Sequence, residues 1–210
     1  MKFRRLRAHS KVSLVIVDTG CANLASVKYA FERLGVSPVI SDDAGVIKAA
    51  ERVVLPGVGS APFAMRNIEI KQLKPVLSGL TQPVIGICLG MQLLFEMLEE
   101  GGKRVEGLGL VEGAVTELRT GDLPAPHMGW NTLTLLRDDP LLEGVNAGDF
   151  AYFVHSFAAG VSDATIAKAE YGSPFSAVVR QGNVWGCQFH PERSSKTGAQ
   201  ILKNFLDIKL

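Results

Sequence analysis

Short apolar runs alternate with an amphipathic segment in the first half of the chain. Residues 23–35 carry apolar positions at helical spacing, with Asn23 placed to cap the start and Gly35 just past the end. Pro38 suggests either an edge position or irregular pairing for the strand that contains it. The apolar runs that predict buried strands lie at 12–17, 36–41, 52–55 and 83–88.

The fourth run leads into a segment that reads as a helix. Its apolar pattern continues from Leu89 to the glycine pair at 101–102. Strands that alternate with helices imply a parallel sheet covered by helices on both faces. We therefore expect a mostly parallel central sheet flanked by helices in this half of the chain.

The second half of the chain is dominated by short β-prone runs separated by turn residues. These runs favour antiparallel hairpins added to the central sheet. They lie at 107–118, 131–136, 151–157, 164–172, 175–182 and 183–189. A last helix is expected over 196–208, with an apolar face of Ile201, Leu202, Phe205 and Ile208. The fold class that follows is one mixed α/β domain over residues 12–210.

Composition and charge narrow the class of protein further. A chain of 210 residues with 47% hydrophobic content is long enough for one full core. Its apolar runs are far shorter than the roughly 20 residues that span a bilayer. The net charge of +1 indicates neither a nucleic acid nor a membrane surface as a partner.

The basic residues are concentrated at the start of the chain. Residues 1–11 hold five Lys or Arg and no acid, which leaves 17 basic and 21 acidic residues, a balance of −4, in the remainder. The segment lacks the apolar region and cleavage site of a signal peptide. We expect a disordered extension there, whether native or the product of an upstream start or a vector.

The chain has three cysteines, Cys21, Cys88 and Cys187. An odd number without a C-x-x-C pair argues against a disulfide framework and a structural zinc site. The sequence gives no reason to expect a metal or a cofactor. A reducing cytoplasm suits such a chain, because a free thiol can act as a nucleophile there.

Cys88 lies between Gly86 and Gly90, where the fourth apolar run meets the predicted helix. In the serine version of this strand–turn–helix arrangement, a strained turn exposes the nucleophile above the sheet. Glycines on either side remove Cβ atoms that would collide in the turn, and a helix N-terminus favours the thiolate. A packed strand end with an inert thiol remains the alternative.

A thiolate nucleophile needs a base, and four histidines are available. His9 lies in the basic segment, His127 in a proline-flanked loop, and His155 inside an apolar run that suits a core histidine. His190 ends a strand and precedes Pro191 and Glu192. If the segment is extended, the carboxylate of Glu192 points to the same side as the ring of His190 and can reach it. A surface turn is the alternative.

Two backbone segments can supply donors to an oxyanion. The first is the amide of Leu89, directly after the nucleophile. The second is the turn at 56–59, where Val58 or Gly59 can direct an N–H toward a ligand. Both follow predicted parallel strands, whose carboxyl ends meet at one crevice. An ordinary turn after a strand is the alternative for 56–59.

Taken together, these motifs resemble those of the class I (triad-type) glutamine amidotransferases. "GICLGMQ" matches the nucleophile motif and "QFHPE" the His–Glu motif, and "VDTGCANLASV", "LPGVG", "PHMGWN", "YFVHSF" and "HPERSSK" follow the family order. Within the family the series is similar to the glutaminase subunits of imidazole glycerol phosphate synthases. It covers nearly the whole chain after the basic segment.

The resemblance implies roles for individual residues. Cys88 would be the nucleophile, His190 the base and acid, and Glu192 its orienting partner. The oxyanion donors would be Val58, Gly59 and Leu89. Substrate contacts would come from Gln92, Glu100 and the backbone at Ser156 and Phe157. The partner interface would include His127, Met128, Trp130, Asn131, Arg193 and Lys196.

Two departures from the family pattern are visible. Relatives often carry Met-Gly where this chain has Cys21–Ala22, which affects no catalytic residue. They often carry Lys where this chain has Arg193, which keeps the charge but changes its shape at the partner face.

The resemblance also implies a reaction and a partner. Glutamine would be hydrolysed to glutamate through a thioester on Cys88. The ammonia would pass to a separate (β/α)8-barrel cyclase subunit for histidine biosynthesis, since this chain holds no second domain. The apolar side chains of Met128 and Trp130 in "PHMGWN" suit a surface that binds another chain. A loop folded over its own core is the alternative.

Three other functions stay open at the level of sequence. The same triad serves the glutaminase subunits of anthranilate, GMP and pyridoxal phosphate synthesis. A cysteine peptidase or γ-glutamyl hydrolase would act without a partner. A regulatory subunit that binds without catalysis would have no need of the Cys88, His190 and Glu192 set.

Overall fold

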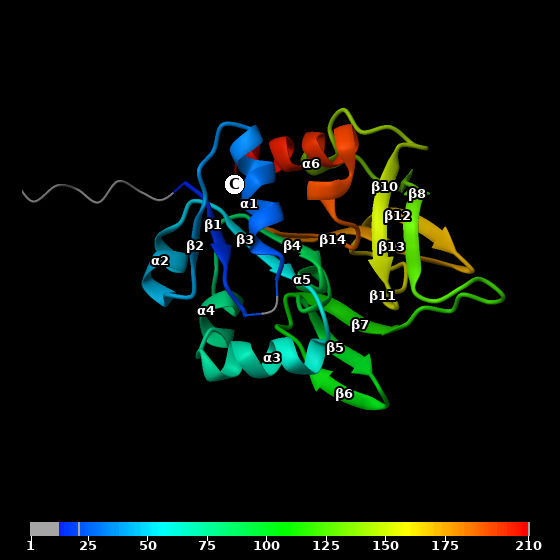
Figure 1. Ribbon diagram of the computed structural model, residues 1–210, viewed down its shortest axis with the longest axis horizontal. Coiled ribbons are helices and arrows are strands. Elements are labelled where there is room, and N and C mark those ends of the chain that lie inside the picture. Colours follow the sequence, from blue (N-terminus) through cyan, green and yellow to red (C-terminus); the bar gives the residue numbers. More distant parts are fainter. Residues whose placement is uncertain (1–12, 21, 210) are drawn as a thin grey trace, which may run out of the picture.

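A computed structural model describes residues 13–20 and 22–209. These residues form an eight-stranded central sheet with helices on both of its faces (Figure 1). The predictions for residues 1–11 and for Cys21 lie outside the described residues. Neighbouring strands are parallel from β2 to β14 and antiparallel from β14 to β9. The order is β2 (Val39–Ser41), β1 (Val15–Val17), β3 (Val53–Gly57), β4 (Val84–Cys88), β14 (Val184–Cys187), β13 (Ser173–Gln181), β12 (Thr165–Tyr171) and β9 (Thr134–Leu135).

The two faces of the sheet bury alternate residues of the same strands. Along the first strand, Leu14 and Ile16 enter one core, while Val15 and Val17 enter the other. Helices α1 (Leu24–Arg33) and α6 (Ser195–Asp207) cover the first core, at the top in Figure 1. The second core is covered by α2 (Ala44–Ala49), α3 (Ala61–Ile70) and α4 (Lys74–Ser78). This confirms the predicted fold class.

The remaining strands only partly extend the central sheet. Strands β13, β12 and β9 do so, but the others form two smaller sheets, which the sequence did not indicate. One holds β11 (Phe157–Ala159), β7 (Val111–Glu117), β5 (Phe95–Glu100) and β6 (Lys103–Glu106). The other pairs β10 (Phe150–His155) with β8 (His127–Thr132). Two 3₁₀ turns complete the described elements, η1 (Pro140–Leu142) and η2 (Pro191–Arg193).

The helix predicted from Leu89 to the glycines at 101–102 is wrong in length. Helix α5 covers only Leu89–Gln92, and residues Phe95–Glu100 form strand β5 instead. Pairing with β7 on one side and β6 on the other gives the segment hydrogen bonds across a sheet. These tertiary partners override the helical preference of its Met, Leu and Glu side chains.

The ends of α1 and the apolar face of α6 follow the sequence pattern. The side chain of Asn23 accepts a hydrogen bond from the amide of Ser26 at 3.3 Å, and Gly35 has a φ of 83° just after the helix. Strand β2, which contains no proline but follows Pro38, lies at the edge of the sheet. Among the described residues, no helix is long and apolar enough to cross a membrane.

Candidate active site

Cys88 stands on a sharp turn at the carboxyl end of β4. Its φ of 54° and ψ of −114° are rare for a residue with a side chain. A Cβ on Gly86 would lie 2.6 Å from the carbonyl oxygen of Gly90, and one on Gly90 would overlap the carbonyl of Leu55. The two glycines therefore let β3, β4 and α5 approach closely enough to form the turn, as the sequence predicted.

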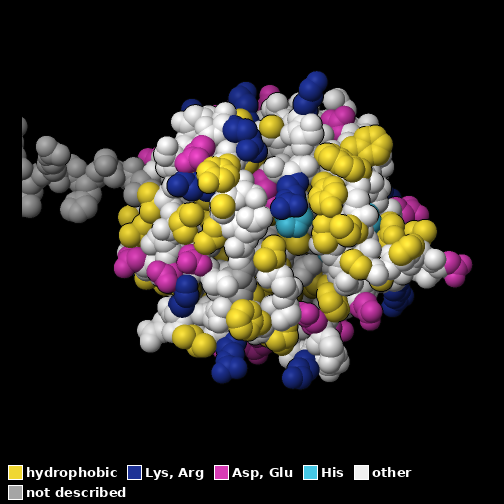
Figure 2. Space-filling view, in the orientation of Figure 1, with side chains coloured by type: hydrophobic (Ala, Val, Ile, Leu, Met, Phe, Trp, Pro, Cys, Tyr) yellow, Lys and Arg dark blue, Asp and Glu magenta, His cyan; other side chains and the backbone are white. Residues whose placement is uncertain are grey.

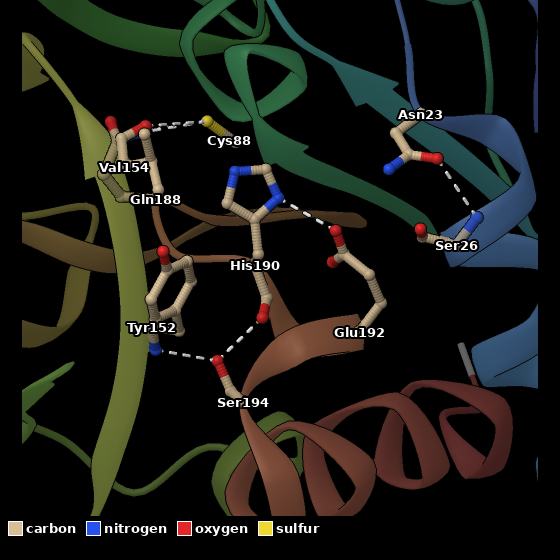
Figure 3. Close-up of polar contacts among 9 residues, drawn as sticks. All are labelled: Asn23, Ser26, Cys88, Tyr152, Val154, Gln188, His190, Glu192 and Ser194. Carbon is tan, nitrogen blue, oxygen red and sulfur yellow. Dashed lines mark hydrogen bonds and ion pairs between the residues drawn. The ribbon is translucent and has the colours of Figure 1, made fainter. Parts of the chain in front are cut away.

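His190 and Glu192 lie beside Cys88 in the order expected of the predicted triad. The ring of His190 lies between the Cys88 sulfur and the Glu192 carboxylate, and its Nδ1 is 2.9 Å from Oε1 of Glu192 (Figure 3). The sequence predicted this contact between His190 and Glu192, but the prediction of an extended backbone through Glu192 is wrong. Glu192 belongs to the 3₁₀ turn η2, because Pro191 starts that turn directly after the extended His190.

The surroundings of His190 decide its charge. Burial by itself lowers the pKa of the imidazole, but hydrogen bonds and charge interactions with Cys88 and Glu192 outweigh this and raise the pKa to about 10. The ring is therefore protonated at neutral pH. A positive charge beside a sulfur favours the reactive thiolate.

Cys187, three residues before His190, is not a competing nucleophile. Its side chain is fully buried in the core below α1 and α6. Burial, and then the negative charge of Glu192, raises the pKa of this thiol far above its usual range. Such a thiol is inert.

A cavity of about 370 Å³ opens beside Cys88. The expected oxyanion segments Val58, Gly59 and Leu89 all line it. Gly59 has a φ of 92°, a conformation that a residue with a Cβ rarely adopts. The other residues that line the cavity are Gln92, Glu100, Pro126, Val154, His155, Ser156, Phe157 and His190. The structure thus brings Cys88, His190 and the predicted oxyanion and substrate-contact residues to one cavity, while Glu192 contacts the His190 ring and does not line the cavity.

Two of the predicted substrate-contact side chains also bind the protein itself. Gln92 is 6% exposed, and its Nε2 donates to the carbonyl of Phe157 at 2.9 Å. Glu100 accepts a hydrogen bond of 2.7 Å from the amide of Ala61, the first residue of α3. Glu100 therefore ties the cavity wall to the helix that follows the Val58–Gly59 turn.

The prediction that His127 contributes its side chain to a partner surface is wrong. The segment is strand β8, not a loop, and the ring of His127 is only 2% exposed because it stacks against Phe153 and Tyr171. Its Nδ1 lies 2.9 Å from Nε2 of His155. Burial lowers the pKa of each histidine to about 4, so both are neutral at pH 7. His155 is a hydrogen-bonded core histidine, as predicted.

The other residues of the predicted partner surface are accessible. Met128 and Trp130 alternate with inward residues along β8 and are 67% and 53% exposed. Arg193 and Lys196 are also exposed, and Asn131 is partly so. Hydrophobic side chains gather on this side of the molecule over β8 and β10 (Figure 2). Exposed apolar side chains gathered at one place suit a surface that binds another molecule.

Two residues that contact members of the predicted triad were missed by the sequence analysis. The hydroxyl of Ser194 donates to the carbonyl of His190 at 2.7 Å and accepts from the amide of Tyr152 at 2.9 Å (Figure 3). Gln188 is fully buried, and its Nε2 lies 4.0 Å from the Cys88 sulfur. A signal for Gln188 existed, because residues two apart in an extended segment share a face and it precedes His190 by two.

No group of three or more His, Cys, Asp or Glu side chains within the described part of the chain could hold a metal ion. What the site offers is a strained cysteine, an imidazolium held by a carboxylate, and backbone amides around one cavity. This set suits attack on an amide carbonyl and protonation of the nitrogen that leaves.

Comparison with known proteins agrees with this chemistry. The family model for class I glutamine amidotransferases matches residues 15–208. The imidazole glycerol phosphate synthase subunit HisH of Vibrio cholerae is 52% identical over 93% of this chain and 98% of that protein. The HisH of Idiomarina loihiensis is 54% identical over 95% and 100%. A solved glutamine amidotransferase shares the fold, with a TM-score of 0.71 at 17% identity over 92% of this chain and 97% of that one.

Proposed function

The chain belongs to the class I glutamine amidotransferase family, and from this premise we propose that it is the glutaminase subunit of an imidazole glycerol phosphate synthase. It hydrolyses glutamine and delivers the ammonia to a cyclase subunit in histidine biosynthesis. Residues 12–210 form the catalytic domain. The observation that carries the reaction is the His190 ring between the Cys88 sulfur and the Glu192 carboxylate (Figure 3). Identity of about half the residues to HisH proteins supports the pathway.

The chemistry begins with the Cys88 thiolate, which attacks the side-chain amide carbon of glutamine. Amides of Leu89 and of Val58 or Gly59 stabilise the oxyanion that forms. The imidazolium of His190 gives its proton to the departing nitrogen, and ammonia leaves. Neutral His190 then takes a proton from water, which attacks the thioester and releases glutamate. Glu192 holds the ring in position and stabilises its positive charge.

The substrate is held by its amino-acid end. The carboxylate of Glu100 and the Oε1 of Gln92 suit the ammonium group, because both are acceptors in the wall of the cavity. Backbone amides at Ser156 and Phe157 suit the carboxylate. The carbonyl of Phe157 already accepts two internal hydrogen bonds and is not available to the substrate.

The partner follows from the fate of ammonia. In neutral water it becomes ammonium and loses its nucleophilic electron pair, so it must pass directly to a second active site. We assign that site to a (β/α)8-barrel cyclase that binds across Met128, Trp130, Asn131, Arg193 and Lys196. The exposed apolar side chains of β8 support this surface. The free thiols Cys88 and Cys187 suit a cytoplasmic location.

The test is the nitrogen source of the cyclase reaction. The chain is purified together with the cyclase and supplied with its nucleotide substrate and either glutamine or a high concentration of ammonium. Cys88→Ala should abolish product formation from glutamine and leave formation from ammonium intact. If glutamine supports no cyclase product but supports anthranilate, GMP or pyridoxal phosphate synthesis, the chain serves that synthase instead.

A further inference from the structure

Two buried glutamine side chains connect the nucleophile to one backbone carbonyl, that of Phe157. Gln92 Nε2 lies 2.9 Å from the carbonyl oxygen and 3.0 Å from Oε1 of Gln188. Gln188 Nε2 in turn lies 4.0 Å from the Cys88 sulfur. Gln92 is 6% exposed and Gln188 fully buried, so water cannot easily replace these contacts.

The Phe157 carbonyl fixes the direction of each hydrogen bond in the series that runs from it to Cys88. A backbone carbonyl can only accept, so Gln92 must turn its NH2 group toward Phe157. The second proton of that NH2 group goes to Gln188, which must therefore present its oxygen to Gln92. The NH2 group of Gln188 is then left to face Cys88. Turning either amide around would bring two donors or two acceptors together in a buried place, which is costly.

The same carbonyl is fixed from the other side by the two buried histidines. Nδ1 of His155 lies 2.9 Å from the oxygen of Phe157 and must carry a proton to bond to it. Nε2 of the neutral His155 is then an acceptor, and Nδ1–H of His127 donates to it. Nε2 of His127 accepts from the side chain of Asn131 at 3.3 Å. Both lone pairs of the carbonyl are thus used, and its position is held by two elements.

We propose that Gln188 is a positioning residue for the nucleophile, which directs an N–H at the Cys88 sulfur in an orientation set by the Phe157 carbonyl through Gln92. The carbonyl of Val154 also faces the sulfur, at 3.8 Å (Figure 3). A thiol donates to this carbonyl, and a thiolate instead accepts from Gln188 and from the imidazolium of His190. Contacts at a catalytic atom are often long before the substrate binds and shorten in the complex, which suits the 4.0 Å distance.

The arrangement has a consequence for the thiolate. A sulfur anion that accepts an N–H from Gln188 as well as from His190 is stabilised by two donors in a buried place. Loss of one donor should destabilise the thiolate and slow its reaction with an alkylating reagent. The proposal rests on the proposed function only in taking Cys88 as the nucleophile, since the thiolate exists without glutamine or a partner.

The experiment measures the rate of iodoacetamide alkylation of Cys88 against pH in the full chain, followed by the mass of the peptide that contains Cys88. Gln188→Met keeps a similar volume without a donor. It should raise the midpoint of the alkylation profile by about one pH unit. Gln188→Leu, which also lacks a donor, should raise it by a similar amount. Gln92→Met, which frees Gln188 to turn, should shift the midpoint in the same direction by less.

The matched control is Gln200→Met on α6, whose Nε2 bonds to Asn204 away from the site. Its midpoint should equal that of the wild type. Circular dichroism shows which variants fold. If Gln188→Met does not fold, Gln188→Leu and Gln92→Met provide the test. A wild-type midpoint in the folded variants of Gln188 and Gln92 would overturn the proposal. Shifted midpoints in a chain that hydrolyses no glutamine even in the complex with the loaded cyclase would support the proposal and reject the proposed function.

Discussion

The carboxylate of Glu192 holds His190 with only one of its two oxygens. Oε1 lies 2.9 Å from Nδ1 of the ring, while Oε2 is buried and has no hydrogen-bond partner among the described residues. The side chain is 2% exposed. A carboxylate placed in this way orients the ring and favours its charged form, but it does not touch the reacting atoms.

The two catalytic partners should therefore differ in their effect on activity. His190→Ala removes the group that moves the proton, so we expect a loss of glutaminase activity of roughly 10⁶-fold. Glu192→Gln leaves the ring and should cost roughly 10⁴-fold. Glutamate formation in the complex with the cyclase measures both. Equal losses in these two variants would mean that Glu192 does more than orient the ring. If His155→Ala lost as much activity as His190→Ala, the assignment of His190 as the catalytic histidine would be wrong.

Cys88 alone should carry the covalent chemistry. Cys88→Ala should abolish glutamine hydrolysis, whereas Cys21→Ala and Cys187→Ala should keep most of it, because Cys187 is fully buried. A glutamine-like diazo ketone should add its mass to the peptide that contains Cys88. Labelling of the Cys187 peptide instead would contradict the assignment.

The buried histidines should make the fold sensitive to acid. The pKa of His127 and that of His155 are each lowered to about 4, from an unfolded value near 6.5, because burial disfavours the charged form. Between these values the unfolded chain binds more protons than the folded one, so stability falls as pH falls from 6.5 toward 4. Each group can contribute up to about 1.4 kcal/mol per pH unit in this window.

Thermal unfolding at pH 7, 6 and 5 measures this dependence. His127→Gln keeps a donor and an acceptor but cannot titrate, so its melting temperature should fall less steeply with pH than that of the wild type. An identical slope in the two proteins would show that His127 takes up its proton equally in both states.

The exposed side of β8 should matter for association and not for the fold. Trp130→Ala should weaken binding of the cyclase by roughly 10-fold or more, since a buried aromatic anchor carries much of an interface's binding energy. Its melting temperature should be near that of the wild type, because Trp130 is 53% exposed. Ile70→Ala is the control, since Ile70 is 68% exposed at the opposite end of α3 from Ala61 and the cavity. Titration calorimetry with the cyclase compares the three proteins, and equal affinities would place the interface elsewhere.

The triad could be predicted from the sequence because its signals are local. Gly86 and Gly90 mark the strained turn at Cys88, and the short spacing between His190 and Glu192 limits their separation. The length of α5 could not be predicted, because residues 95–100 gain strand partners that lie elsewhere in the chain. The burial of His127 depends on the rings of Phe153 and Tyr171 in the same way.

The wider network around the site is a tertiary property as well. Gln92 and Gln188 are 96 positions apart, and the carbonyl that orients both belongs to a third segment. Nothing in the local sequence around Phe157 indicates that its carbonyl accepts two side-chain hydrogen bonds. Backbone acceptors carry no residue type, so a sequence pattern cannot reveal them.

Glutamine hydrolysed without a loaded cyclase would be wasted, so we expect the partner to control the reaction. The turn at Val58 and Gly59 is the expected switch, since a glycine can hold a peptide N–H either toward or away from the substrate oxygen. One missing oxyanion donor reduces the rate by roughly 10²–10³-fold. A single peptide rotation can therefore supply much of the control.

The most direct measurement is the rate of glutamate formation by the isolated chain, by the complex with the cyclase, and by that complex with a nucleotide ligand of the cyclase. We predict that the isolated chain is nearly inactive and that the loaded complex is roughly 10²–10³-fold faster. Cys88→Ala should remove the activity in all three cases. An isolated chain that already hydrolyses glutamine at the rate of the loaded complex would contradict both the switch and the dedicated synthase partner.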